Sequence, residues 1–181
     1  VVAYNYIHHN IYTGLLIYEG TYTHHNTITE NGIDDQWGWW ANLGLSIGYE
    51  SEAPIIEYNN ISSNPYAGAY ISCATWMGNP GTAIFQHNTV NNNGYAVVNF
   101  SYLYSGMEIY ATPVYFNNNT FSGNYMGLYY QADIWSGVFS GVVYNSTIVS
   151  STNYDVVGMD WDVLVINTTT DLPYAEIQSG T

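Results

Sequence analysis

The 181-residue chain contains no lysine and no arginine, and 14 Asp and Glu residues give it a formal net charge of −14. Binding to nucleic acid or to an anionic membrane surface requires cationic side chains, so both functions are excluded. Walker-type nucleotide sites, Schiff-base lysines and arginine clamps are excluded for the same reason. Apolar residues make up 47% of the chain and aromatic residues 17%, which is the composition of a folded protein with a core.

The length favours one domain, and we assign residues 1–181 to a single unit. The chain begins with VVAYNY and without Met, so we interpret it as a processed chain or as part of a longer polypeptide. Cys73 is the only cysteine, which excludes an intrachain disulfide.

The predicted elements follow a repeat of the form Asn-x-apolar-x-x-Asn. Its apolar positions are separated by 21, 33, 29, 31 and 27 residues and are occupied by Ile7, Ile28, Ile61, Val90, Phe121 and Ile148. A degraded seventh copy is expected from Asn167. Short β-branched and aromatic runs, bounded by Gly, Pro and Asn, flank the repeat and predict strands at 14–18, 54–58, 68–72, 82–86, 94–100, 113–116, 127–131 and 141–144.

Three short strands per repeat predict an all-β fold, a parallel β-solenoid of about six coils with Asn at its corners. Asn suits such corners because its amide can bond the local backbone and because it tolerates the left-handed conformation. Equivalent amides in stacked coils can also bond one another. We therefore predict two structural ladders, Asn5, Asn26, Asn59, Asn88 and Asn119 in one and Asn10, Asn31, Asn64, Asn93 and Asn124 in the other. Ser146 and Ser151 replace Asn in the sixth repeat.

The pattern Asn-x-apolar-x-x-Asn-x-x-x-Gly-apolar, over about residues 4–170, resembles the repeat of right-handed parallel β-helix proteins with the pectin-lyase-like fold. Among these, the chain resembles archaeal-type cell-surface β-helix proteins. The resemblance implies the right hand of the solenoid. Enzymes that this resemblance brings into consideration act on acidic polysaccharides through active sites that contain Arg and Lys. This chain has neither residue, so no such active site carries over to it.

Two carboxylate pairs offer the chemistry of a glycoside hydrolase for a neutral sugar, which needs only two acidic side chains about 5–10 Å apart. They are Glu50 with Glu52 and Asp160 with Asp162. We interpret both pairs as solvated acidic residues, and we expect no catalytic residue.

Metal binding has two sets of candidates. Carboxylate oxygens favour Ca²⁺, and Asp155 with Asp160 and Asp162 forms the candidate site, with Asp34 and Asp35 as another acidic pair. No other cofactor is expected. The pairs His8-His9 and His24-His25 are metal-like as well, but adjacent residues of a strand point to opposite faces. We therefore expect one imidazole of each pair on each face, and the two pairs could approach one another across successive repeats.

Aromatic residues and sequons suggest surface contacts. Trp37, Trp39 and Trp40 lie in an excursion of the second repeat, where they either stack on a carbohydrate or pack against the protein or a neighbouring subunit. Sequons for N-glycosylation, hence possible attached glycans, occur at Asn60, Asn99, Asn118, Asn145 and Asn167.

Three features together favour a structural extracellular protein. Charged residues make up only 8% of the chain, Tyr and Asn are abundant, and the solenoid has no evident caps. We expect a homo-oligomer or polymer: a subunit of a cell-surface filament, sheath or S-layer that assembles through end-to-end or side contacts. An acidic habitat is compatible with the composition, because carboxylates are largely neutral at about pH 2–3. The alternative is a β-helix that binds or cleaves a neutral polysaccharide with a Trp platform and a carboxylate pair. A viral receptor-binding module is a third hypothesis.

Overall fold

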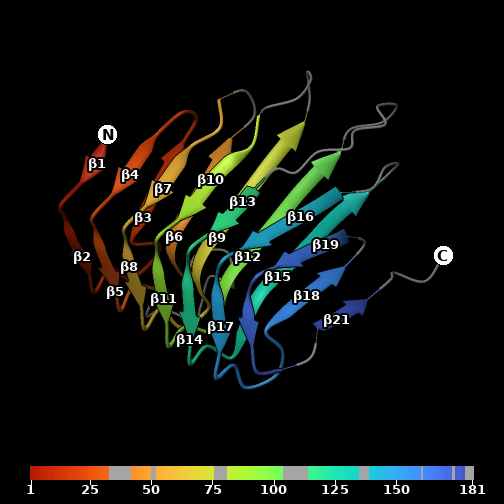
Figure 1. Cartoon of the computed structure of the whole chain (residues 1–181). Coiled ribbons are helices and arrows are strands. Elements are labelled where there is room, and N and C mark those ends of the chain that lie inside the picture. Colours follow the sequence, from red (N-terminus) through yellow and green to blue (C-terminus); the bar gives the residue numbers. More distant parts are fainter. Residues whose placement is uncertain are drawn as a thin grey trace.

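The structure is a computed structural model that describes residues 1–32, 42–49, 52–75, 81–103, 114–134, 139–159, 161–172 and 174–177. These residues form three parallel sheets that wrap around one interior, with the N-terminus and the C-terminus at opposite ends of the stack (Figure 1). The predicted parallel β-solenoid with three strands per coil is confirmed. Within the described part of the chain, no helix has the length and apolarity needed to cross a membrane.

Within the described residues, each sheet contains seven strands. Sheet A consists of β1 (Val2–Ala3), β4 (Tyr22–His24), β7 (Ile55–Glu57), β10 (Ala83–Gln86), β13 (Val114–Asn117), β16 (Phe139–Tyr144) and β19 (Trp161–Ile166). Sheet B consists of β2 (Tyr6–His8), β5 (Thr27–Thr29), β8 (Asn60–Ser62), β11 (Thr89–Asn91), β14 (Thr120–Ser122), β17 (Thr147–Val149) and β20 (Thr169–Thr170). Sheet C consists of β3 (Leu15–Tyr18), β6 (Leu43–Tyr49), β9 (Ala67–Thr75), β12 (Tyr95–Leu103), β15 (Met126–Ile134), β18 (Val156–Met159) and β21 (Tyr174–Ile177).

One coil runs from sheet A through a first corner to sheet B, and through a second corner to sheet C. The apolar residues of the Asn repeat are register partners in sheet B, where Ile28 pairs with Ile61 and Val90 pairs with Phe121. The register continues into a seventh layer, because Ile148 pairs with Thr170. The degraded seventh copy is therefore a real coil of the solenoid.

The core is a column of inward-facing side chains from all three sheets. Ile28, Ile56 and Ile61 are fully buried, and near the middle of the stack the interior becomes aromatic. The ring of Phe116 lies 5.4 Å from that of Phe85 and 6.1 Å from that of Tyr130, in a tilted and an edge-to-face arrangement respectively. Burial of these layers is the main stabilising contribution in a chain without Lys or Arg.

Glycine marks the entry to sheet C for a steric reason. A Cβ atom on Gly14 would lie 2.7 Å from the side chain of Asn31, and one on Gly44 would lie 2.6 Å from that of Asn64. The glycine that follows the second ladder residue in the repeat thus leaves room for the ladder amide of the next coil.

Candidate functional site

The two corners carry the predicted Asn residues as continuous hydrogen-bonded columns. Asn59 is representative: its backbone N–H and its Nδ2 both donate to Oδ1 of Asn88, at 2.9 and 3.0 Å, and Nδ2 also donates to the carbonyl of Glu57. At the second corner Asn64 donates in the same way to Asn93 and to Ser62. Each interior Oδ1 therefore accepts two N–H groups from the preceding coil. Asn26, Asn31, Asn59, Asn64, Asn88, Asn93, Asn119 and Asn124 are buried, whereas Asn5 and Asn10 of the first coil are exposed.

The first column continues beyond its last asparagine. Asn119 donates its backbone N–H to Oγ of Ser146 at 3.2 Å, and Ser146 donates in turn to Oγ1 of Thr168 at 3.3 Å. The seventh-coil equivalent of the ladder residue is therefore Thr168. Asn167, from which the degraded copy was expected to start, lies one position earlier.

The left-handed conformation belongs to the residue before each ladder Asn, so its assignment to the ladder Asn itself was wrong. At the first corner positive φ angles of 47° to 58° occur at Tyr4, His25, Tyr58, His87, Asn118, Asn145 and Asn167. At the second corner the equivalent residues are His9, Glu30, Ser63, Asn92, Gly123 and Ser150. The ladder Asn fixes the corner, and its predecessor bears the unusual backbone angle.

The left-handed residues of the first corner stack on one another along the solenoid. The ring of His25 lies 5.1 Å from that of Tyr4 and 5.1 Å from that of Tyr58, and Tyr58 lies 4.8 Å from His87. Tyr4, His25 and Tyr58 are exposed, so this ring column is a surface feature. Further along the same column Nδ2 of Asn167 donates to Oδ1 of Asn145 at 2.6 Å.

The two histidine pairs form dyads with the same geometry. Nδ1 of His8 lies 2.7 Å from Nδ1 of His9, and Nδ1 of His24 lies 2.9 Å from Nδ1 of His25. In both dyads the two rings are nearly perpendicular, at 87°. The expectation that the imidazoles of each pair lie on opposite faces was wrong, because the second His has left the strand and its positive φ turns its ring back toward the first.

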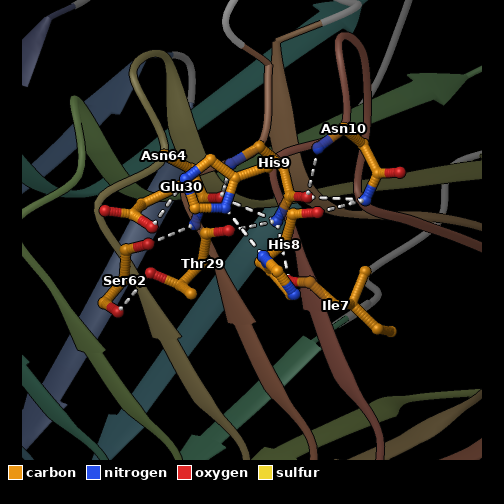
Figure 2. A network of polar contacts seen from close by, with 9 residues as sticks. Ile7, His8, His9, Asn10, Thr29, Glu30, Ser62 and Asn64 are labelled. Atoms are coloured by element: carbon orange, nitrogen blue, oxygen red, sulfur yellow. Dashed lines mark hydrogen bonds and ion pairs between the residues drawn. The ribbon is translucent and has the colours of Figure 1, made fainter.

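Each dyad has its own surroundings. Figure 2 shows the rings of His8 and His9 at the second corner, with Glu30 of the next coil beside His9. Nε2 of His9 lies 3.3 Å from Oε2 of Glu30. The His24–His25 dyad lies at the first corner among the stacked rings. The two dyads therefore occupy different corners and do not approach one another.

Glu57 lies beside the second dyad, as the register partner of His24 in sheet A. Its carboxylate accepts hydrogen bonds from the hydroxyl of Tyr22 and, at 2.8 Å, from Nε2 of Gln86. These two hydrogen bonds lower the pKa of Glu57, and the one between Tyr22 and Glu57 raises the pKa of Tyr22. Sequence reasoning missed Glu30 and Glu57, although their place one repeat after a His was a usable signal.

Asp155, one of the three ligands expected for calcium, contacts the backbone of the seventh coil. It is buried, and its Oδ2 accepts the backbone N–H groups of Asp171 and Leu172 at 2.8 Å each. The extended strand β18, about 13 Å long at roughly 3.3 Å per residue, follows Asp155 and separates it from Asp162 in β19. Asp160 lies outside the described residues, and among those described no group of three or more His, Cys, Asp and Glu side chains could hold a metal ion.

Several other predicted positions lie wholly or partly outside the described residues. These are Trp37, Trp39 and Trp40, the acidic residues Asp34, Asp35 and Glu50, and the side chains of Asn99 and Asp162. Neither carboxylate pair is described in full. Of the sequons, Asn60, Asn118 and Asn167 are exposed and Asn145 is half-buried.

A further aromatic cluster lies on sheet C and carries no sequence signal beyond the abundance of Tyr. Tyr66, Tyr70, Tyr95 and Tyr129 pack over the buried residues Leu43, Ala67 and Val98. Burial, together with the neighbouring phenols of Tyr95 and Tyr129, raises the pKa of Tyr66 to about 12.

Comparison with known proteins gives one result. Searches of curated proteins and of solved structures returned no significant match. A family model described as a right-handed β-helix region matches residues 1–153, which is most of the chain and covers both Asn ladders. This protein therefore belongs to the right-handed β-helix family.

Proposed function

We propose that this chain is a structural subunit of an extracellular cell-surface assembly, such as a filament, sheath or S-layer, in which solenoids stack end to end. The supporting observation is that, among the described residues, the first and seventh coils carry the Asn-ladder and apolar positions that join the interior coils, and each has a neighbouring coil on one side only. The proposal has two parts, one polar and one apolar.

The polar part is the direction of the Asn ladders. Every interior ladder Oδ1 accepts N–H groups from the coil before it, but in the described residues no donor contacts Oδ1 of Asn5 or Asn10. At the other end Thr168 occupies the ladder position of the first corner. In the interior coils the backbone N–H of each ladder residue donates to the ladder side chain of the next coil, so the backbone N–H of Thr168 would donate to the ladder side chain of a following coil. A second copy placed after the seventh coil would present Asn5 at this position.

The apolar part is the interior column of sheet A. Val143 is fully buried, whereas its register partner Val165 in the seventh coil is 36% exposed. Val2 is half-buried at the opposite end of the solenoid. Stacking a second copy would cover Val165 with the first coil, and the removal of this apolar surface from water favours association.

The composition fits a cell-surface location. A chain without Lys or Arg offers no cleavage site to trypsin-like proteases, and exposed sequons at Asn60 and Asn118 would be accessible to glycosylation outside the cell. The net charge of −14 opposes stacking, so the proposal requires low pH, bound cations or salt to offset the repulsion.

Two neighbouring substitutions in β19 test the proposal. Val165→Asp places a carboxylate on the inward face, where stacking would bury it without a partner. Leu164→Asp is the matched control, because Leu164 faces outward, is 57% exposed and would remain in water in a stacked assembly. Both variants and the wild type are compared by negative-stain electron microscopy and sedimentation velocity, after thermal unfolding has shown that all three are folded.

The wild type and Leu164→Asp are expected to form filaments or sheets, and Val165→Asp is expected to remain dispersed. Equal assembly of the two variants would contradict end-to-end stacking. Dispersed wild-type molecules at every pH and salt concentration would contradict the assembly itself. Retention of those molecules on a neutral polysaccharide would then favour the carbohydrate-binding alternative.

A further inference from the structure

We propose that the His8–His9 dyad is a chelating site for a divalent first-row transition metal ion, and that the His24–His25 dyad is a second such site. In each, the ligands are the two Nδ1 atoms. The inference is independent of the proposed assembly, because both dyads lie on the lateral corners of the solenoid.

The separation of the two nitrogens fits one class of coordination. Imidazole nitrogens bind such metals at about 2.0–2.1 Å. Two nitrogens 2.7 to 2.9 Å apart therefore subtend about 80–90° at the metal. Right angles between neighbouring ligands belong to square-planar and octahedral complexes, as formed by Cu²⁺ and Ni²⁺, whereas tetrahedral Zn²⁺ requires a wider angle. In the structure the two Nδ1 atoms of each dyad are joined by a hydrogen bond, so metal binding requires that the shared proton leave and that the exposed rings turn both lone pairs toward the ion.

The surroundings of the first dyad supply the usual support for a ligating imidazole. A metal-bound His commonly donates its second ring N–H to a carboxylate, which fixes the ring and makes the ligating nitrogen more basic. Nε2 of His9 lies 3.3 Å from Oε2 of Glu30, and Figure 2 shows the two side chains next to each other. Glu30 therefore acts as a positioning residue. At the second dyad Glu57 is the register partner of His24 and supplies negative charge nearby.

Recurrence is a separate argument for a built site. Both dyads consist of a strand-end His followed by a left-handed His that precedes a ladder Asn. The same backbone geometry thus places two Nδ1 atoms together at two different corners. The chain contains no Lys or Arg side chain to repel a cation or to compete for the carboxylates. The remaining coordination positions are open to water, so the bound ion would be exchangeable.

The chain itself suggests the test variants. Asn occupies the left-handed position of other coils at both corners, at Asn92 and at Asn118, so His9→Asn and His25→Asn remove one ligand while preserving the backbone. His87→Asn is the matched control, because His87 occupies the same column but lies between a Tyr ring and Asn118, without an adjacent His.

The probe is Ni²⁺, which does not oxidise the thiol of Cys73, added to the full 181-residue chain without a histidine tag. Isothermal titration calorimetry is carried out in excess Mg²⁺, which occupies sites made of carboxylates alone. The wild type and His87→Asn are expected to bind two Ni²⁺ ions. His9→Asn and His25→Asn are expected to bind one each, and the double variant none. Glu30→Gln should weaken only the first site, by about 10- to 100-fold.

A spectroscopic measurement identifies the ligands directly. The electron paramagnetic resonance spectrum of the Cu²⁺ complex of His25→Asn should show hyperfine coupling to two imidazole nitrogens. The proposal is overturned if the double variant binds Ni²⁺ as the wild type does, if His87→Asn loses a site, or if the wild type binds no Ni²⁺. Circular dichroism of each variant separates loss of the site from loss of the fold.

Discussion

The residue before each ladder Asn has an unfavourable left-handed backbone conformation, and its side chain points outward from the corner. A left-handed φ disfavours most side chains by about 1–2 kcal/mol, yet this chain places Tyr, His, Glu and Ser there. The adjoining Asn fixes the corner through buried hydrogen bonds, which holds these side chains outward in stacks and dyads. The ladder thus determines where the chemically interesting residues lie.

An interior ladder residue should be far more important for stability than the exposed one at the end. Asn88→Ala leaves the buried backbone N–H of Asn59 and the carbonyl of Ile56 without the partners they have now. Two such groups correspond to a loss of about 2–6 kcal/mol in the free energy of unfolding. Asn5→Ala, in the exposed first coil, should lower it by about 1 kcal/mol or less. Denaturant unfolding of both variants measures the difference, and equal losses would argue against the ladder as the main polar support.

The left-handed position predicts an unusual response to glycine. Ser63 has a φ of 56° and is exposed, so Ser63→Gly should raise the free energy of unfolding by about 0.5–1 kcal/mol. The adjacent Ser62 is a strand residue whose Oγ donates to Oγ1 of Thr29, and Ser62→Gly should lower it by a similar amount. Chemical denaturation of both variants tests the sign, and a loss of stability in Ser63→Gly would contradict the assigned backbone strain.

For single residues, the sequence predicts the ladder Asn positions well, but it does not predict the orientation of the side chains that precede them. The spacing of Asn59, Asn88 and Asn119 placed them in one column because a parallel stack repeats every side-chain position. The shared face of His8 and His9 could not be predicted in the same way. It depends on a backbone angle that ordinary strand alternation does not include.

Among the elements, the strands of sheet C differ most from their sequence prediction. The run at 68–72 continues as β9 to Thr75, and the run at 94–100 continues as β12 to Leu103. Neither extension contains the Gly, Pro or Asn residues that usually end a strand, so the sequence could not show where β9 and β12 end. The short strands β1 and β4 were missed for the opposite reason, since two or three residues are too few to show alternation.

The tyrosine cluster on sheet C predicts a particular alkaline sensitivity. The pKa of Tyr66 is raised to about 12 in the folded protein, whereas a tyrosine in the unfolded chain titrates near 10. The folded state therefore binds the proton more tightly, and the stability from this group is present below about pH 10 and is lost as the pH rises toward 12. Between these values the melting temperature of the wild type should fall more steeply than that of Tyr66→Phe.

The control for this prediction is Tyr18→Phe, which removes an exposed phenol. Its melting temperature should depend on pH as that of the wild type does. Thermal unfolding followed by circular dichroism at several pH values gives the comparison. Identical slopes for Tyr66→Phe and the wild type would show that Tyr66 is not held neutral by the cluster.

For the whole molecule, charge decides under which conditions solenoids can associate. Each copy has a net charge of −14 and no cationic side chain besides His, so stacked copies repel one another. Raising the ionic strength from roughly 10 to 150 mM shortens the Debye length from about 30 to about 8 Å and should lower the concentration at which assembly begins. Sedimentation across a salt series measures this dependence. Assembly that weakens with salt would indicate an attractive ionic contact instead.

The solenoid architecture follows from the sequence because the repeat imposes it, whereas the proposed stacking of copies does not follow from the repeat. Asn columns and apolar layers are local patterns that any stacked coil must satisfy, so their spacing carries the fold. The proposed end-to-end association rests on the exposure of Val165 and Asn5 at opposite ends, and only the three-dimensional arrangement reveals that exposure.

The most direct test of the central proposal is the axial repeat of the assembled protein, measured by cryo-electron microscopy or by diffraction from aligned filaments. If copies of this 181-residue chain stack coil on coil, the seven described layers at roughly 4.8 Å give a repeat of about 34 Å per copy, with a strand spacing that continues across each junction. Filaments with a markedly different repeat, or with solenoid axes lying across the filament, would contradict the stacking of the seventh coil on the first.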